Sequence, residues 1–340
     1  MGRIVLALLV SACAADPVIV HPDARNSTPP PPSFDGYTVH GNTVVGPDGR
    51  PHRFRGVARP SLEWNPAGEQ LSLADYQRIA AWGANVVRIP LTQCFWLSDS
   101  PNYDAGYRAR VDKNVEWANA AGLDVILDLH RSDRGTPSVW PAQQRMADRR
   151  SVQFWSQVAA RYRNNRRVLF ELYNEPHDVS WTVWRDGGNS GDGFVVAGMQ
   201  ELYDTVRATG ADNLVIAGGL DFAYDLREVR SYALTGTNIL YATHPYRPYA
   251  NKLPNEWTTY WGYLADTHAV IATEFGDVSG NCAADYSAQL IDYAEAHGVS
   301  WLSWAWYPSG CSFPSLIADW SGTPTRAGEV VRAALMELRQ

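Results

Sequence analysis

Lysine, cysteine and long apolar runs are scarce in this 340-residue sequence, and each shortage narrows the possible functions. The two lysines, Lys113 and Lys252, fall in a predicted helix and a predicted loop, which argues against an enzyme that forms a Schiff base at a strand end. The net charge of −7 implies no basic face, so we expect no nucleic-acid partner. The histidines form no HxH or HExxH pattern, which argues against a metal-dependent hydrolase, and we predict neither metal nor cofactor.

The N-terminal residues have the features of an export signal. Arg3 precedes an apolar run, residues 4–10, that is too short to span a bilayer, and small residues follow. The "VSAC" ending resembles a bacterial lipobox, in which Cys13 would carry the lipid, while ordinary cleavage near Ala14 or Ala15 is the alternative. We therefore expect an exported protein, either a cell-surface lipoprotein or a secreted one, with no membrane contact except this possible anchor.

Composition also predicts the domain boundaries. Residues 1–15 are the predicted signal, and residues 16–36, rich in proline and polar side chains, predict an extended linker. Residues 37–340 provide enough apolar side chains for one large core, so we expect a single domain and a monomer.

Aromatic side chains are abundant, with 14 tryptophans and 17 tyrosines. Packing in the core is the ordinary explanation. The alternative is a set of flat platforms for sugar rings, because tryptophan offers a broad apolar face.

After the N-terminal region, short apolar runs alternate with segments of helical spacing. The predicted strands are residues 52–58, 84–91, 123–130, 168–175, 213–220, 239–246, 269–276 and 299–306. Their continuous apolar character predicts a parallel sheet covered by helices, and eight such units predict an α/β fold, the (β/α)₈ TIM barrel. An open doubly wound sheet is the alternative, but no nucleotide-binding loop stands out.

Three shorter segments have weaker patterns. Residues 37–58 predict a short N-terminal β-hairpin with its turn at "GPDGR". The Gly-rich residues 187–193 predict a flexible loop, and residues 221–236 are the weakest of the predicted helices.

Polar and aromatic side chains lie at the carboxyl ends of the predicted strands, where the active sites of such barrels are found. They are Arg88, His130, Asn174, Glu175, His244, Tyr246, Glu274, Trp304 and Trp306. Two carboxylates on one rim suit cleavage of a glycosidic bond, because one protonates the leaving group while the other attacks the anomeric carbon or activates water. This division of labour predicts a raised pKa for Glu175 and a lowered pKa for Glu274, beside Arg88.

The motifs "VVRIP", "DLH", "LYNEP", "HPY", "TEFG" and "SWAW", in this order, resemble glycoside hydrolase family 5, the cellulase family of clan A. The resemblance extends from about residue 37 to the C-terminus. It implies that Glu175 is the acid/base and Glu274 the nucleophile of a retaining, endo-acting enzyme that cleaves β-1,4-linked polysaccharide, with β-glucan favoured. A β-mannanase or another β-glycanase of the family is the alternative.

The resemblance also implies supporting roles. Asn174 would bind the sugar 2-hydroxyl, Arg88 and Tyr246 would bond the nucleophile, and His130 and His244 would be the strand-end histidines. Trp304 would form the floor of the −1 subsite, and Trp306, two residues further on, stays a candidate because it would face the same side of a strand.

Two further sequence features qualify this interpretation. Ala58 and Arg59 stand where the family often has an asparagine and a small residue, which affects the substrate contacts expected near Trp64. Glu171 is interpreted as a buried, paired carboxylate below the site. A surface-tethered sugar-binding protein on a decayed barrel is the non-enzymatic alternative, but it would be expected to lose Glu175 or Glu274.

The remaining cysteines predict one disulfide bond. Cys282 and Cys311 follow adjacent strands, and loops after adjacent strands lie side by side, so we expect these two to pair. Cys94 follows a strand on the far side of the barrel and should stay unpaired; three free thiols are the alternative.

Overall fold

Eight parallel strands close into a barrel in the computed structural model, which describes residues 2, 36–136, 142–281 and 283–339. In chain order the strands are β3 (Arg55–Ala58), β4 (Val86–Thr92), β5 (Asp124–Arg131), β6 (Val168–Glu171), β9 (Val215–Gly218), β10 (Ile239–Thr243), β12 (Val270–Ala272) and β14 (Ser300–Ser303). Neighbours in the chain are neighbours in the sheet, and β14 pairs back with β3. The predicted (β/α)₈ barrel is confirmed.

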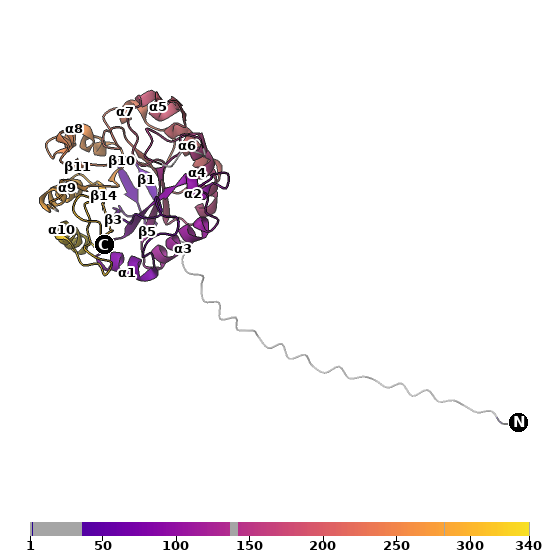
Figure 1. The fold of residues 1–340 in the computed structure, drawn as a ribbon, viewed down its shortest axis with the longest axis horizontal. Coiled ribbons are helices and arrows are strands. Elements are labelled where there is room, and N and C mark those ends of the chain that lie inside the picture. Colours follow the sequence, from indigo (N-terminus) through magenta and orange to yellow (C-terminus); the bar gives the residue numbers. More distant parts are fainter. Residues whose placement is uncertain (1, 3–35, 137–141, 282, 340) are drawn as a thin grey trace. The chain divides into compact units, whose positions relative to one another are not determined.

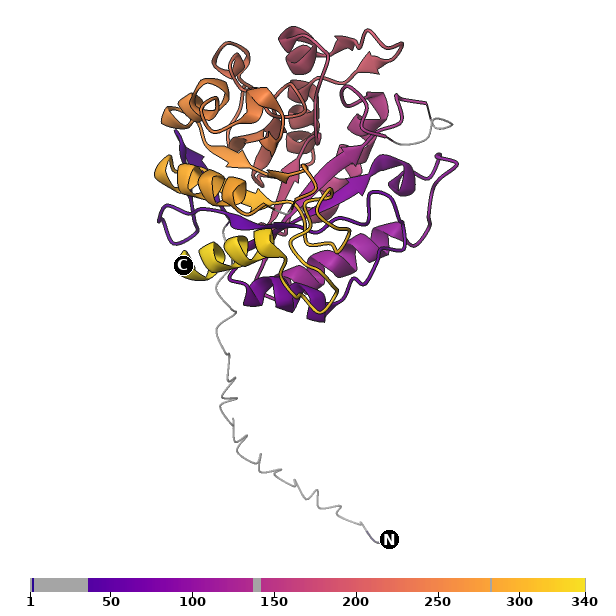
Figure 2. The same cartoon turned by 60° about the vertical axis from the view of Figure 1, so that its left-hand side comes forward.

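Helices surround this barrel on its outer side (Figure 1). The helices with their bounds are α1 (Leu73–Ala81), α2 (Gln93–Trp96), α3 (Tyr107–Ala120), α4 (Arg149–Tyr162), α5 (Trp181–Asp186), α6 (Met199–Ala208), α7 (Val229–Tyr232), α8 (Trp257–Tyr260), α9 (Asp285–Ala296) and α10 (Arg326–Glu337), with the 3₁₀ helices η1 (Ala250–Lys252) and η2 (Gly262–Asp266). Helix α10 lies beside α9 and closes the ring (Figure 2). Within the described part of the chain, no helix is long and apolar enough to cross a membrane.

Successive residues of a strand enter different parts of the core. Val86 and Ile126 pack inside the barrel, whereas Val87 and Leu127 pack outward against the helices. This alternation follows from the two-residue period of a strand. Both faces are therefore buried, which explains why the strands are apolar along their whole length.

The N-terminal hairpin is present with its turn at "GPDGR", as predicted, and another turn, which was not predicted, precedes it. Strands β1 (Thr38–His40) and β2 (Thr43–Val45) pair antiparallel, and the chain reverses at Gly41 and Asn42. The "GPDGR" segment forms a second tight turn immediately afterwards, in which the Gly46 N–H donates to the Arg50 carbonyl at 2.8 Å. Two turn-forming sequences lie close together here, and only the second was recognised.

Two other segments also differ from the sequence-based expectation. The Gly-rich residues 187–193 contribute to a two-stranded antiparallel pair, β7 (Gly188–Asn189) with β8 (Val195–Val196). Residues 221–236 contain only one helical turn, α7, and the first two residues of the segment, Asp221 and Phe222, lie at the carboxyl end of the barrel. Cys13 lies outside the described residues, as do the predicted signal and linker apart from Gly2 and Gly36.

Candidate active site

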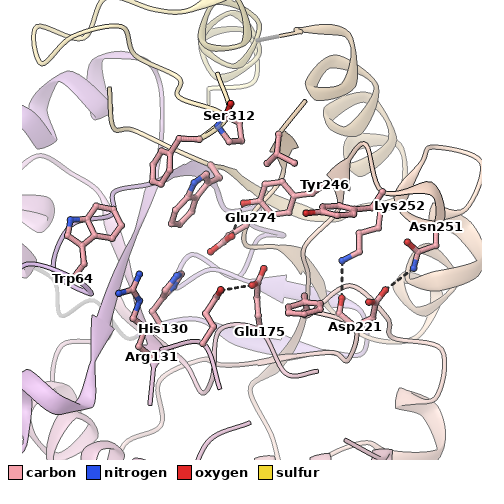
Figure 3. A pocket seen from close by; sticks show the side chains of 17 residues that line it. Trp64, His130, Arg131, Glu175, Asp221, Tyr246, Asn251, Lys252, Glu274 and Ser312 are labelled. Carbon is pink, nitrogen blue, oxygen red and sulfur yellow. Dashed lines mark hydrogen bonds between the residues drawn. The ribbon is translucent and has the colours of Figure 1, made fainter. Parts of the chain in front are cut away.

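A cavity of about 660 Å³ opens at the carboxyl ends of the barrel strands (Figure 3). Its lining residues are Trp64, His130, Arg131, Gln143, Glu175, Asp221, Phe222, Tyr246, Tyr249, Asn251, Lys252, Glu274, Val278, Trp304, Ser312, Phe313 and Pro314. Glu175 and Glu274 face each other across the middle of this cavity, with Trp64 towards one end and Lys252 towards the other. Of the predicted site residues, His130, Glu175, Tyr246, Glu274 and Trp304 line it.

Arg88 lies directly beneath the cavity and is completely buried. Its guanidinium donates through Nε to Glu171 Oε2 at 2.5 Å, through Nη2 to Asn174 Oδ1 at 2.7 Å, and through Nη1 to Glu274 Oε1. Nη2 also lies 2.9 Å from Asp128 Oδ2. A planar guanidinium with several fixed donors can therefore orient residues on or just after three other strands, β5, β6 and β12, at once.

Glu171 is buried and paired, as predicted from the sequence. In addition to Arg88, it accepts a hydrogen bond from Thr273 Oγ1 at 2.6 Å. Arg88 and His244 hold the pKa of Glu171 at about 2, against the effect of burial. This carboxylate supports the site from below and does not line the cavity.

Glu274 follows β12 and is 4% exposed. One carboxylate oxygen accepts from Arg88, and the other accepts from the Tyr246 hydroxyl at 2.7 Å. Both carboxylate oxygens therefore accept a hydrogen bond, one from a guanidinium and one from a hydroxyl group, and these bonds fix the orientation of the Glu274 side chain.

His244 connects the two glutamates of the cavity. Its Nδ1 lies 3.1 Å from Glu175 Oε1 and 3.7 Å from Glu274 Oε2, and its Nε2 lies 2.8 Å from Thr273 Oγ1. Because the Thr273 hydroxyl already donates its proton to Glu171, Nε2 must be the donor to Thr273. Nδ1 faces two carboxylates, which can only accept a hydrogen bond, so Nδ1 carries a proton as well.

The resulting imidazolium is stabilised by its neighbours. Burial alone would lower the pKa of His244, but Glu274, Glu171 and Glu175 together raise it to about 9. His244 therefore carries a positive charge at neutral pH, at the centre of three carboxylates.

The pKa of Glu175 differs from the prediction. Burial favours its neutral form, but the hydrogen bond and positive charge of His244 outweigh burial and lower the pKa of Glu175. The expectation of a raised pKa was wrong because it considered Glu175 without a protonated histidine beside it. The proton expected on Glu175 resides instead on His244, 3.1 Å away.

One wall of the cavity is built around Trp304 and His130. The two rings are stacked, with centroids 5.8 Å apart and an interplanar angle of 14°. Asp128 Oδ2 lies 2.7 Å from His130 Nδ1 and fixes that ring, while burial lowers the pKa of His130 to about 4. His130 is therefore neutral at neutral pH, in contrast to His244.

Trp306 does not line the cavity, so its candidacy as a substrate-binding residue was wrong. Its side chain is completely buried, its indole N–H donates to Asp75 Oδ1 at 2.9 Å, and its ring packs edge-on against Trp82. The same-side argument requires a continuous strand, and β14 ends at Ser303. Trp306 belongs to the core between barrel and helices.

Several lining residues were not identified from the sequence. Gln143 Nε2 donates to Glu175 Oε2 at 2.5 Å. The wall on the Lys252 side is formed by Asp221, Phe222, Tyr249, Asn251 and Lys252. These residues lie in irregular segments between strands, where no hydrophobic period signals their position. A lone lysine near a strand end was the available clue, and it was interpreted only as a loop residue.

The structure tests one part of the prediction for the cysteines. Cys94 is buried and unpaired, as predicted, with Sγ 3.3 Å from Asp133 Oδ2. Cys282, the expected partner of Cys311, lies outside the described residues, so their pairing stays a prediction.

Glu175, His244 and Glu274 also have the spacing of a cation site, since one ligand atom of each lies within 4.8 Å of the other two. However, a histidine must lose its proton before it can bind a metal ion. The raised pKa of His244 opposes that loss.

Comparison with known proteins places the chain in a family. The model of the family "Cellulase (glycosyl hydrolase family 5)" matches residues 45–310, and the chain belongs to that family. The motifs that lie on or directly after β4, β5, β6, β10, β12 and β14 all fall inside the matched range.

Individual relatives share about a quarter of the sequence. Endoglucanase N of Pectobacterium atrosepticum is 25% identical over 88% of this chain and 61% of its own length, and an endoglucanase of Paenibacillus polymyxa is 24% identical over 84% and 83%. A β-glucanase from Saccharophagus degradans superposes with a TM-score of 0.74 and 25% identity, covering 92% of this chain and 99% of its own. The chain spans about three-fifths of the length of the first of these relatives.

Proposed function

We propose that the protein is a retaining, endo-acting glycoside hydrolase that cleaves β-1,4-glucan. The observation that carries the proposal is the pairing of Glu175 and Glu274, which reach within 4.8 Å of each other through one oxygen each and share His244. Carboxyl groups about 5–5.5 Å apart serve double displacement, whereas an inverting pair needs about 6.5–9.5 Å to admit a water molecule.

In this mechanism Glu274 is the nucleophile. Arg88 and Tyr246 hold its oxygens in place, so that one oxygen can attack the anomeric carbon of a sugar on Trp304. The amide nitrogen of Asn174, which has no partner among the described residues, is the donor proposed for the sugar 2-hydroxyl.

Glu175 is the proposed acid/base, acting together with His244. The pair holds one proton at neutral pH, and the short hydrogen bond between them allows it to pass from Nδ1 through Glu175 to the departing oxygen. In the second step Glu175, again a carboxylate, takes a proton from the attacking water. Gln143 holds its second oxygen in place through both steps.

The substrate assignment is supported by the relatives. Several carry the name endoglucanase, and the Saccharophagus β-glucanase has been solved with cellotetraose. In this chain the cavity offers aromatic faces at both ends, Trp64 on one side and Tyr249 on the other, which suits a polymer that continues past the reacting bond.

Purified protein tests this function directly. Wild type should release oligosaccharides from soluble β-1,4-glucan, and less or none from mannan; the reverse preference would favour the mannanase alternative. Glu274→Gln should lose at least 1,000-fold in kcat, whereas Glu116→Gln, on the exposed face of α3, should keep wild-type rates. Binding of glucan without any hydrolysis by wild type would instead support a sugar-binding protein.

We also propose that the protein is exported, anchored through Cys13 and held away from the membrane by the linker of residues 16–36, and that it acts as a monomer. A Cys282–Cys311 disulfide bond is part of this proposal. A β-carbon added at Gly280 would lie 3.4 Å from Ser312 Oγ, so the chain segments that carry the two cysteines are adjacent. Such a bond would join two segments of the cavity rim and raise the free energy of unfolding by roughly 3–4 kcal/mol.

A further inference from the structure

A network of buried polar side chains joins α2, the chain after β5 and the start of α4. Asp133 follows β5 by two residues, Asp148 is the N-cap of α4, and both are completely buried, as is Gln93 on α2. The amide nitrogen of Gln93 donates to Asp133 Oδ1 at 2.7 Å and to Asp148 Oδ2 at 3.0 Å, and the Asp133 N–H donates to Asp148 Oδ2 at 3.1 Å. All three residues lie outside the described lining of the cavity.

Helix α4 provides further donors to this network. Asp148 accepts from the backbone N–H groups of Arg150 and Ser151 at 2.8 Å and 3.1 Å, and Asp133 accepts from Arg150 Nε at 3.1 Å. The Ser151 hydroxyl donates to Gln93 Oε1 at 2.8 Å. The Gln93 amide therefore accepts through its oxygen and donates through its nitrogen, which fixes its orientation.

Two carboxylates in one buried network are unfavourable unless other contacts compensate. Burial, together with the charge of Asp148, raises the pKa of Asp133. Such a network is stable only when its groups are hydrogen-bonded, and it then selects one geometry for the segments that it joins. We therefore looked for a functional side chain whose position this geometry determines.

The chain after Asp133 carries such a side chain. Ser132, next to Asp133, exchanges two backbone hydrogen bonds with Ala142, each of 3.1 Å. Gln143 follows Ala142 directly and donates to Glu175 Oε2 at 2.5 Å. The residue that contacts the proposed acid/base is thus one position away from a backbone pair that the network holds in place.

We propose that Gln93 is a positioning residue of the reaction and acts through Gln143 on Glu175. By joining Asp133 to Asp148, it sets the place at which Gln143 meets the carboxyl group. The inference rests on the proposed function, in which that carboxyl group delivers a proton to the departing oxygen. A displacement of 1 Å in such a group can lower the rate about 100-fold.

Leaving groups that differ in their need for a proton separate this role from a general loss of structure. Phenyl β-cellobioside needs a proton on its departing oxygen, whereas 2,4-dinitrophenyl β-cellobioside departs without one. Gln93→Met removes the amide donors and should lower kcat/KM at least tenfold on the first substrate and less than twofold on the second. Tyr76→Phe removes a buried hydrogen bond between α1 and α3, from Tyr76 to Asn114, and should match wild type on both.

A double-mutant cycle tests whether Gln93 acts through Gln143. In a Gln143→Ala background, Gln93→Met should lower kcat/KM on phenyl β-cellobioside less than twofold further, because the contact with Glu175 is already lost. Ser151→Ala removes the donor to Gln93 Oε1 and provides a milder variant. It should show the same dependence on the leaving group, with at least a threefold loss on phenyl β-cellobioside.

The outcomes distinguish this inference from the proposed function. Equal losses on both substrates in Gln93→Met and Ser151→Ala, or equal effects of Gln93→Met in both backgrounds, overturn the positioning role while the proposed hydrolase remains. If Gln93→Met does not fold, the leaving-group dependence of Ser151→Ala decides. Glu175→Ala is the reference, and equal losses on both substrates in that variant would overturn the proposed role of Glu175 and the inference together.

Discussion

Replacement of His244 by asparagine tests the shared proton most sharply. In the wild type the Glu175–His244 pair loses the proton that it would donate to the leaving group as the pH rises through the pKa of His244, about 9. The basic limb of the pH profile of kcat/KM should therefore lie near that pH. Asparagine has no titratable group, and in His244→Asn the catalytic proton must reside on Glu175 itself. The basic limb should then move to lower pH by at least two units.

The magnitude follows from the titration. Above the basic limb, each pH unit lowers kcat/KM tenfold. If the limb of His244→Asn lies two units below that of the wild type, kcat/KM of this variant at pH 9 should be about 100-fold lower than its own value at pH 5. The ratio of kcat/KM at pH 9 to kcat/KM at pH 5 cancels any loss of activity from misplaced side chains that is the same at both pH values. His40→Asn, at an exposed position of β1, is the control and should leave the profile unchanged.

The assay is a pH profile of kcat/KM on a soluble β-glucan for all three proteins. An unchanged basic limb in His244→Asn would refute the reasoning, because the proton would then not depend on the histidine. The same residue should also affect stability. Its raised pKa gives a stabilisation that is complete below about 6.5 and is lost as pH rises through about 9, on the order of 3 kcal/mol in total.

Three further predictions concern other parts of the molecule. Trp306→Phe removes the hydrogen bond to the buried Asp75, so it should lower the free energy of unfolding by about 1–3 kcal/mol in urea titrations with KM unchanged; a raised KM with full stability would return Trp306 to the substrate site. Cys282→Ser should lower the free energy of unfolding by roughly 3–4 kcal/mol, and thiol counting on unfolded, unreduced wild type should find one free cysteine in residues 37–340; three would exclude a bond to Cys311. Wild type should partition with membranes and Cys13→Ala should not; recovery of wild type only as soluble protein would reject the anchor.

The sequence predicted the barrel well because its signals are local and repeated. Each strand is a short apolar run, and the residues at the strand ends follow in order along the chain, so parallel topology alone brings Glu175 and Glu274 to one rim. The family resemblance implied that Arg88 and Tyr246 are partners of Glu274, and the hydrogen bonds bear this out.

The features that were missed depend on tertiary structure. The low pKa of Glu175 arises from a histidine that three carboxylates, on or just after the two strands β6 and β12, keep protonated, and no local pattern encodes that charge. Trp306 left the predicted face because β14 ends three residues earlier than the apolar run. The segment that contains Phe222 was predicted to be a helix. Its left-handed backbone could not be recognised in the sequence, because it has no sequence period and contains no glycine.

The stereochemistry of hydrolysis tests the central claim most directly. Proton NMR spectra recorded during the first minutes of cellotetraose cleavage resolve α and β anomers before mutarotation mixes them. If Glu274 is the nucleophile and Glu175 the acid/base at the observed separation, the first product should be the β anomer, with the configuration of the substrate retained. Initial formation of the α anomer would show single displacement by water and would contradict the assignment of Glu274.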